Sequence, residues 1–275
     1  MPTKRKEERY EIDLDDGLRR ELVGTWVQEK HQRLRYYVDI SRAARRKFHG
    51  NSTFIDLYCG PGRARIKDTP VIVPGSAVVA ASEAARHAAF GKIYIGDISA
   101  TNLDHCRQRL EQERLSPIIA FEGAAEVTAQ AVSRELSPSA LHFAFLDPYS
   151  VQALPFTVIE ALAELPKMDI LIHFSIMDMQ RNIKALMKAG KLDQFAPGWR
   201  DQVDPALRNA SALLAVFHYW CGLIRNLGYY VSDNVERVSG THNQPLYWLV
   251  LVSKDKLGER FWDKISNVTP QPRLL

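Results

Sequence analysis

The chain has 275 residues, of which 46% are hydrophobic and 25% are charged. This composition is ordinary for a folded globular protein and argues against a disordered or low-complexity chain. No apolar run approaches the ~18 residues of a membrane span, and the charged residues 1–16 lack the apolar centre of a secretory signal. We therefore expect a folded cytoplasmic protein that does not associate with a membrane.

The three cysteines, Cys59, Cys106 and Cys221, are far apart, and no Cys-x-x-Cys pair indicates zinc or dithiol chemistry. We expect reduced, mostly buried thiols and no metal site. The net charge of +4 is too small to establish nucleic-acid binding, because affinity depends on where the charges cluster.

The basic residues cluster between residues 17 and 47. This segment contains nine basic and three acidic residues, a local excess of six positive charges. This segment is either a solvated helix face or a surface for nucleic-acid phosphates. Its basic residues are Arg19, Arg20, Lys30, Arg33, Arg35, Arg42, Arg45, Arg46 and Lys47.

Residues 17–50 are expected to be a basic N-terminal helical segment, with one long amphipathic helix over 25–48 and Thr25 as its N-cap. Short, apolar, β-branched runs then alternate with segments of helical periodicity. The expected strands are 53–58, 92–95, 117–121, 141–146 and 170–174, and the expected helices are 76–89, 101–114, 126–136 and 155–165. Such alternation predicts an α/β fold with a mostly parallel, doubly wound sheet.

The alternation stops at residue 177. Residues 177–228 are expected to form a helical insertion, with helices near 179–189 and 205–226 and the loop 195–199 between them. Two more strands, 229–236 and 246–253, and a C-terminal helix from about Lys254 complete the prediction. Because there is no internal repeat and no convincing linker, we expect one domain over residues 1–275.

A glycine turn follows the first strand of this sheet, where Asp56 to Gly62 reads Asp-Leu-Tyr-Cys-Gly-Pro-Gly. Open α/β proteins bind ligands at the carboxyl ends of their strands. Gly60 and Gly62 tolerate the turn without steric cost, and Asp56 is placed to accept a hydrogen bond from a cofactor's ammonium group. No third glycine completes the dinucleotide fingerprint, which disfavours a nicotinamide cofactor. The turn predicts a Rossmann-like domain that binds S-adenosylmethionine; the alternative is a purely structural turn.

The second strand of the sheet ends in Ile-Gly-Asp-Ile, which puts Asp97 where Rossmann-like folds bind ribose hydroxyls. Asp97 lies further from the glycine turn in sequence than the corresponding acidic residue usually does. We attribute this to residues 65–74, which are expected to form an extra loop that closes over the cofactor.

The fourth strand runs directly into Asp147-Pro148-Tyr149. In amino-group methyltransferases a similar turn, with a second proline, aligns an exocyclic nitrogen with the methyl sulfonium and stacks an aromatic ring on a flat acceptor. We therefore predict Asp147, Pro148 and Tyr149 as the catalytic residues. Transfer to such a nitrogen requires positioning and no covalent nucleophile, so Cys59 is expected to pack in the core. His142 and His173 lie inside strands and are expected to be core histidines.

These motifs together resemble those of the three-Cys-motif partner (TcmP) family, whose members look like Rossmann-fold methyltransferases. The resemblance covers most of the chain and rests on Val23-Gly24-Thr25-Trp26, Lys30-His31, the run from Ile55 to Gly62, Pro74-Gly75-Ser76-Ala77, Asp147-Pro148-Tyr149 and the run from Leu246 to Val250. It implies a protein partner that is radical-SAM-like.

Lys30 and His31 also resemble a Lys-His pair that some adenine methyltransferases place beside the cofactor's carboxylate. Ala124 stands where many methyltransferases keep an Asp or Asn for the adenine amino group. The predicted cofactor-binding residues are Lys30, His31, Asp56, Tyr58, Gly60, Gly62, Asp97, Ile98 and Ala124.

The sequence thus predicts an S-adenosylmethionine-dependent methyltransferase that acts on an amino nitrogen, with a nucleic-acid base as the expected acceptor. The rival interpretation is a non-catalytic or weakly catalytic partner protein, which Ala124 and the single proline after Asp147 favour. Methylation of a protein or a small molecule is a third interpretation.

Overall fold

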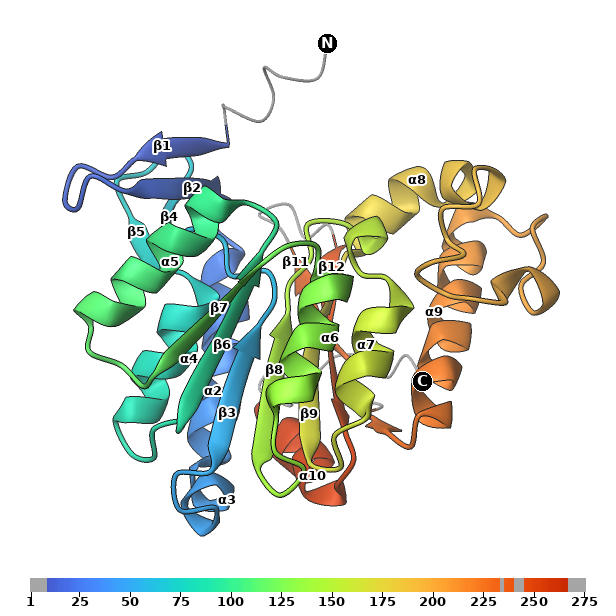
Figure 1. Ribbon diagram of the computed structural model, residues 1–275. Helices are drawn as coiled ribbons and strands as arrows, with labels where there is room; N and C mark the ends of the chain where they lie inside the picture. The colour runs from blue at the N-terminus through green and yellow to red at the C-terminus, as the bar shows by residue number, and fades with distance from the viewer. Residues whose placement is uncertain (1–8, 233–234, 240–244, 267–275) are drawn as a thin grey trace. The chain divides into compact units, whose positions relative to one another are not determined.

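The computed structural model describes residues 9–232, 235–239 and 245–266 (Figure 1). The chain forms two compact units. Unit 1 comprises Met1–Ala124 and Ala140–Phe145, and unit 2 comprises Ala125–Ser139 and Leu146–Leu275. The expected single domain over 1–275 stays a prediction.

The main sheet of unit 1 confirms the predicted α/β alternation. Its parallel strands lie in the order β8 (Leu141–Leu146), β3 (Ser52–Asp56), β6 (Lys92–Asp97) and β7 (Ile118–Glu122). The connecting helices α4 (Ser76–Ala85) and α5 (Ala100–Gln112) pack on these strands, and α2 (Val27–Ile40) packs on α4. Strand β3 is buried along its whole length, as its apolar, β-branched sequence requires.

A second, four-stranded sheet in unit 1 was not expected. Its strands are β1 (Tyr10–Ile12), β2 (Arg19–Val23), β4 (Arg63–Ile66) and β5 (Ile72–Pro74), in that order. Two predictions are therefore wrong: residues 17–50 are not helical throughout, and residues 65–74 are a β-hairpin rather than a loop. The sequence did not indicate these strands, because several of their positions carry charged residues instead of the apolar residues of a buried strand. The ion-pair partners of some of these charged residues lie far away in the sequence.

The long helix expected over 25–48 is also interrupted. Helix α2 begins after Trp26, which replaces Thr25 as the N-cap, and α3 (Arg42–Lys47) follows after Ser41. The Ser41 hydroxyl donates to the carbonyl oxygens of Tyr37 and Val38 at 2.7 and 3.1 Å. Such bonds from a serine back to the preceding turn compete with the helix and bend it.

Unit 2 contains α6 (Ala125–Glu135), α7 (Phe156–Ala163) and an antiparallel group of strands. Strand β12 (Pro245–Ser253) pairs with β9 (Met168–Phe174), β10 (Tyr230–Val231) and β11 (Glu236–Ser239). The strand expected over 229–236 is not continuous, and residues 233–234 lie outside the described residues. Helix α10 (Lys256–Ser266) packs on β12, as the predicted C-terminal helix.

The stretch expected as a helical insertion contains α8 (Ile176–Lys188), a 3-10 turn η2 (Trp199–Asp201) and α9 (Asn209–Asn226). An aromatic cluster joins these elements to the strands of unit 2. Phe174 of β9 stacks on Trp248 of β12 at a centroid distance of 5.6 Å, and Phe195 stacks on Trp220 of α9 at 5.3 Å. Phe217 of α9 contacts Phe174 at 5.0 Å and Trp248 at 4.7 Å, so these buried rings hold α9 to the strands.

Candidate cofactor and acceptor sites

The glycine turn lies between β3 and β4 in unit 1. Gly60 and Gly62 have φ of +57° and +79°, a backbone conformation that side chains rarely adopt. A Cβ on Gly62 would also lie only 3.0 Å from the Cα of Cys106, and one on Gly75 would lie 2.8 Å from the backbone of Gly62. The turn therefore requires glycine both for its conformation and for its close packing on α5 and α4.

Asp56 fixes the start of this turn. Its side chain is fully buried, and its two carboxylate oxygens accept from the Tyr58 N–H at 3.1 Å and from the Ser76 hydroxyl at 2.5 Å. Because Ser76 is the first residue of α4, the carboxylate joins the turn to that helix. Asp56 thus has a structural role whether or not it also binds an ammonium group.

Asp97 lies at the end of β6, beside the turn. Its carboxylate accepts from the N–H groups of Gly60 at 3.1 Å and Ser99 at 2.8 Å. Burial raises the pKa of Asp97, while hydrogen bonds from these two groups and from Asn102 act in the opposite direction. Asn102 also donates to the Tyr10 hydroxyl at 3.1 Å, and its own Oδ1 is buried without a partner among the described residues. A buried acceptor left unpaired beside a carboxylate suits a site for ligand hydroxyl groups.

The sequence did not reveal Tyr10 or Asn102 as site residues. Tyr10 comes from β1, in a segment whose mixed charges gave no structural pattern, and Asn102 lies on α5, where one polar residue is unremarkable. Only the second sheet places Tyr10 close to Asn102.

The other predicted cofactor residues differ in exposure. Ile98 is 74% exposed, whereas Tyr58 and Ala124 are half-buried. The Gly123 N–H donates to the Asp97 carbonyl at 3.1 Å, so the ends of β6 and β7 meet here. Lys30 and His31 are buried on α2, at 8% and 5% exposure, and their contact with a cofactor carboxylate stays a prediction.

Cys59, inside the turn, is buried at 3% exposure. Burial raises the pKa of its thiol well above the usual value, and a hydrogen bond with Cys106 acts in the same direction. A thiol held in its protonated form is a poor nucleophile. This agrees with the prediction that Cys59 packs in the core.

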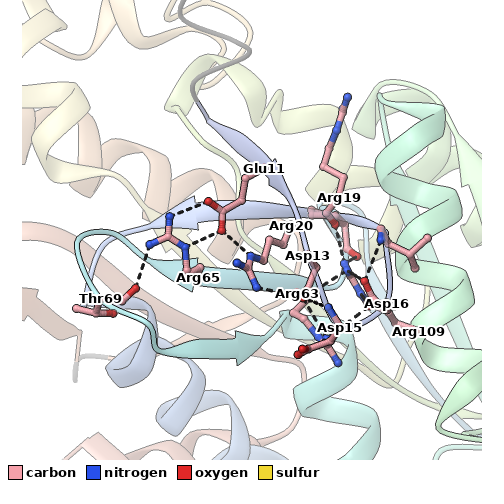
Figure 2. A network of polar contacts seen from close by, with 12 residues as sticks. Glu11, Asp13, Asp15, Asp16, Arg19, Arg20, Arg63, Arg65, Thr69 and Arg109 are labelled. Carbon is pink, nitrogen blue, oxygen red and sulfur yellow. Dashed lines mark hydrogen bonds and ion pairs between the residues drawn. The ribbon is translucent and has the colours of Figure 1, made fainter.

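A network of arginines and carboxylates connects the strands of the second sheet and α5 (Figure 2). The buried guanidinium of Arg109 on α5 donates to the Pro61 carbonyl at 2.6 Å and to both carboxylate oxygens of Asp16 at 2.8 and 2.9 Å. Arg65 of β4 donates to both oxygens of Glu11 at 2.6 and 2.7 Å. A cavity of about 250 Å³ opens here, but Arg63 and Arg109 in its lining are already paired with aspartates.

The predicted phosphate-binding segment 19–47 is only partly available to a partner. Four of its basic residues are buried: Arg20, Lys30, Arg33 and Arg45. Arg20 pairs with Glu11 and Asp13, and Arg45 donates to backbone carbonyl oxygens. Buried, paired cations contribute to folding rather than to an open surface for phosphates.

The predicted acceptor motif belongs to unit 2. Pro148 is buried, whereas Tyr149 is 71% exposed. Asp147 Oδ1 lies 2.6 Å from Nδ1 of His173 on β9, and the His173 ring meets Tyr247 edge-on at a centroid distance of 4.3 Å. The expectation that His173 is only a core histidine missed this pairing. His142 does behave as a core residue, fully buried, with its Nδ1 at 2.7 Å from the Thr53 hydroxyl.

In the part of the chain that the structure describes, no helix is long and apolar enough to cross a membrane. Within residues 9–232, 235–239 and 245–266, no group of three or more His, Cys, Asp or Glu side chains is arranged to hold a metal ion.

No protein-family model matches the chain. No curated protein matches it either. Among solved structures, the chain is similar to protein LPL1258 of Legionella pneumophila, described with the family model DUF519, at 8% identity and a TM-score of 0.50, over 86% of this chain and 91% of the other. It is also similar to an O-methyltransferase of Bacillus cereus in complex with SAH, at 12% identity and a TM-score of 0.46, over 80% of each chain.

An rRNA methylase of Streptococcus thermophilus is a further similar structure, at 12% identity and a TM-score of 0.41, over 84% of this chain and 98% of the other. At such identities the likeness to the Legionella protein is one of fold. The sites of this chain therefore have to be argued from its own residues.

Proposed function

We propose that the protein is an S-adenosylmethionine-dependent methyltransferase that modifies an amino nitrogen of a nucleic-acid base. The observation that carries the proposal is Asp97, held at the end of β6 beside the N–H of Gly60. A glycine turn and an acidic strand end on neighbouring parallel strands suit a ligand with an amino-acid part and a ribose.

The residues of unit 1 fit this cofactor. Asp97 would bind the ribose hydroxyls, with Asn102 beside it, and the turn through Gly60 and Gly62 would leave its backbone open to the ligand. Exposed Ile98 offers an apolar contact for the adenine ring. When bound, S-adenosylmethionine supplies a methyl group on a sulfonium sulfur.

In unit 2, Asp147 would accept a hydrogen bond from the acceptor nitrogen, and Tyr149 would stack on its ring. Pro148 holds the turn between them. His173 is then a positioning residue, because its contact with Asp147 Oδ1 restricts rotation of the carboxylate. The solved structures described above include a methyltransferase of rRNA, which is compatible with a nucleic-acid acceptor.

Calorimetric binding of S-adenosylmethionine to the wild type and to Asp97→Asn tests the cofactor site. Losing the charged acceptor costs about 1.5–3 kcal/mol, so affinity should fall about 10- to 100-fold. Asp104→Asn, at an exposed position on α5, is the matched control and should bind normally. Asp56→Ala is less informative, because it also removes the bond to Ser76. Equal affinity in the wild type, Asp97→Asn and Asp104→Asn would refute the assignment of Asp97.

Transfer of a labelled methyl group to pools of tRNA, rRNA and DNA tests the acceptor. The label should be nuclease-sensitive, and Asp147→Asn should lose transfer while it still binds the cofactor. Normal turnover in Asp147→Asn would contradict the acceptor assignment.

The TcmP resemblance supports a second candidate, a Rossmann-like partner protein that acts through a radical-SAM-like protein. The observation that favours it is Ala124, which has no side-chain group for the adenine amino group. Stable co-purification with such a partner, together with no methyl incorporation into any nucleic-acid pool, would establish it in place of the first proposal.

A further inference from the structure

Helix α8 and the turn that follows it present a row of four basic side chains to solvent. Arg181, Lys184 and Lys188 are exposed on one side of the helix, at a spacing of three and four residues, and exposed Lys191 lies three residues further along, beyond the end of the helix. The opposite side is apolar and packs on α9 and β12. Its buried residues are Ile176, Met179, Ile183, Leu186 and Met187.

None of the ion pairs among the described residues involves this basic row. Arg181, Lys188 and Lys191 form no ion pair with any residue that the structure describes, and Lys184 donates to the Pro205 carbonyl at 2.6 Å. The acidic residue of α8, Asp178, lies in the first turn, where its side chain accepts bonds from other groups. Of the nine basic residues in segment 19–47, by contrast, five are buried or paired, namely Arg20, Lys30, Arg33, Arg42 and Arg45.

Helix α8 also begins at the predicted acceptor motif. The Val151 N–H, two residues after Tyr149, donates to Asp178 Oδ2 at 3.2 Å. Ser175 caps the helix by accepting from the Asp178 N–H at 3.4 Å. The loop that carries the exposed Tyr149 ring is therefore fixed to the start of the helix that carries the basic row.

The dimensions suit a sugar-phosphate backbone. From Arg181 to Lys188 the helix advances about 10 Å at its rise of ~1.5 Å per residue. A row of this length can contact more than one phosphate of the same strand. An unpaired base is needed for stacking on Tyr149, because a base inside a duplex does not expose its ring.

We propose that the basic row of α8 binds the phosphate backbone of a single-stranded nucleic-acid segment next to the base presented to Tyr149. The inference rests on the proposed function for its acceptor class. It assigns the main backbone contact to the insertion in unit 2 and not to residues 19–47.

The test compares two charge-reversal variants of the full chain. One is the triple variant Arg181→Glu, Lys188→Glu and Lys191→Glu. The matched control is Lys92→Glu, Arg134→Glu and Arg225→Glu, which changes the net charge equally at exposed positions without ion-pair partners among the described residues. Circular dichroism and S-adenosylmethionine calorimetry confirm that each variant is folded.

Fluorescence anisotropy then measures binding of single-stranded RNA and DNA of mixed sequence from about 50 to 200 mM salt. The α8 variant should lose affinity at least tenfold at the lower salt. Its slope of log affinity against log salt should fall by about 2, from three lost contacts at ~0.7 each. The control should keep most of its affinity and slope, and comparison of the two strands shows whether the ribose 2′-hydroxyl contributes.

Equal losses in the two variants would mean a general charge effect and would overturn the proposal. So would unchanged affinity in the α8 variant, no binding by the wild type, or equal competition by polyglutamate. Failure of the proposed function is distinguishable: nucleic acid bound through α8 without any methyl transfer would contradict the enzyme activity and leave this surface in place. If the α8 variant retained methyl transfer in full, the enzyme activity would stand and the α8 surface would be contradicted.

Discussion

Replacing Arg109 by methionine should cause a large loss of stability in unit 1. The side chain is 4% exposed and donates to both oxygens of Asp16, to the Pro61 carbonyl at 2.6 Å and to the Arg19 carbonyl at 2.8 Å. Methionine keeps much of the apolar stem but removes the donor to the Pro61 and Arg19 carbonyls, and it leaves Asp16 with the Leu18 N–H and the more distant Arg63. Breaking a buried ion pair from one side costs about 3–5 kcal/mol.

The matched control is Arg107→Met on the same helix. Arg107 is 42% exposed and pairs with Asp104 and Glu111 at the surface, where such pairs contribute about 0.2–1 kcal/mol. Urea unfolding followed by circular dichroism should shift the Arg109→Met midpoint down by about 1 M or more and the control's much less. Amide hydrogen exchange should locate the loss in β2 and the glycine turn. Equal midpoints for the two variants would refute the reasoning.

Three further predictions concern pH, thiol reactivity and turnover. Hydrogen bonds from Arg65 lower the pKa of Glu11 from 4.5 to about 2, so its contribution to stability is present above pH 4.5 and is lost as the pH falls towards 2. Glu11→Gln should flatten the unfolding free energy across that range; parallel wild-type and variant curves would count against it. Burial should keep Cys59 and the other two thiols unreactive towards a disulfide reagent until the protein unfolds, and rapid native labelling would contradict this. His173→Ala should lower kcat with little effect on cofactor affinity. His173→Asn, which keeps a polar group in contact with Asp147, should restore part of the lost kcat; equal kcat in these two variants would argue against positioning.

Much of the fold was predictable because buried parallel strands require apolar, β-branched runs. Strands β3, β6, β7, β8 and β9 all lie within two residues of their predicted ends, and the helices between them were expected. The glycine turn was predictable for a similar reason: its positive φ values demand Gly60 and Gly62 whatever the surroundings.

The candidate site was only partly predictable. Asp97 was identified because a carboxylate at a strand end is a local feature. The contact between Asp147 and His173 was not predictable, since Asp147 follows β8 whereas His173 lies on β9, and neither local sequence pattern indicates the other residue.

The sequence by itself determined the alternation of strands and helices, the turn at residues 56–62 and the two acidic strand ends, because each depends on residues close together in the chain. Only the tertiary structure decided the four-stranded sheet and its charge network, in which Arg109 is bound to Asp16 from 93 positions away. It also decided which cations of segment 19–47 are buried and which side of α8 is exposed. Electrostatic pairing and burial depend on separation in space, and separation along the chain does not reveal it.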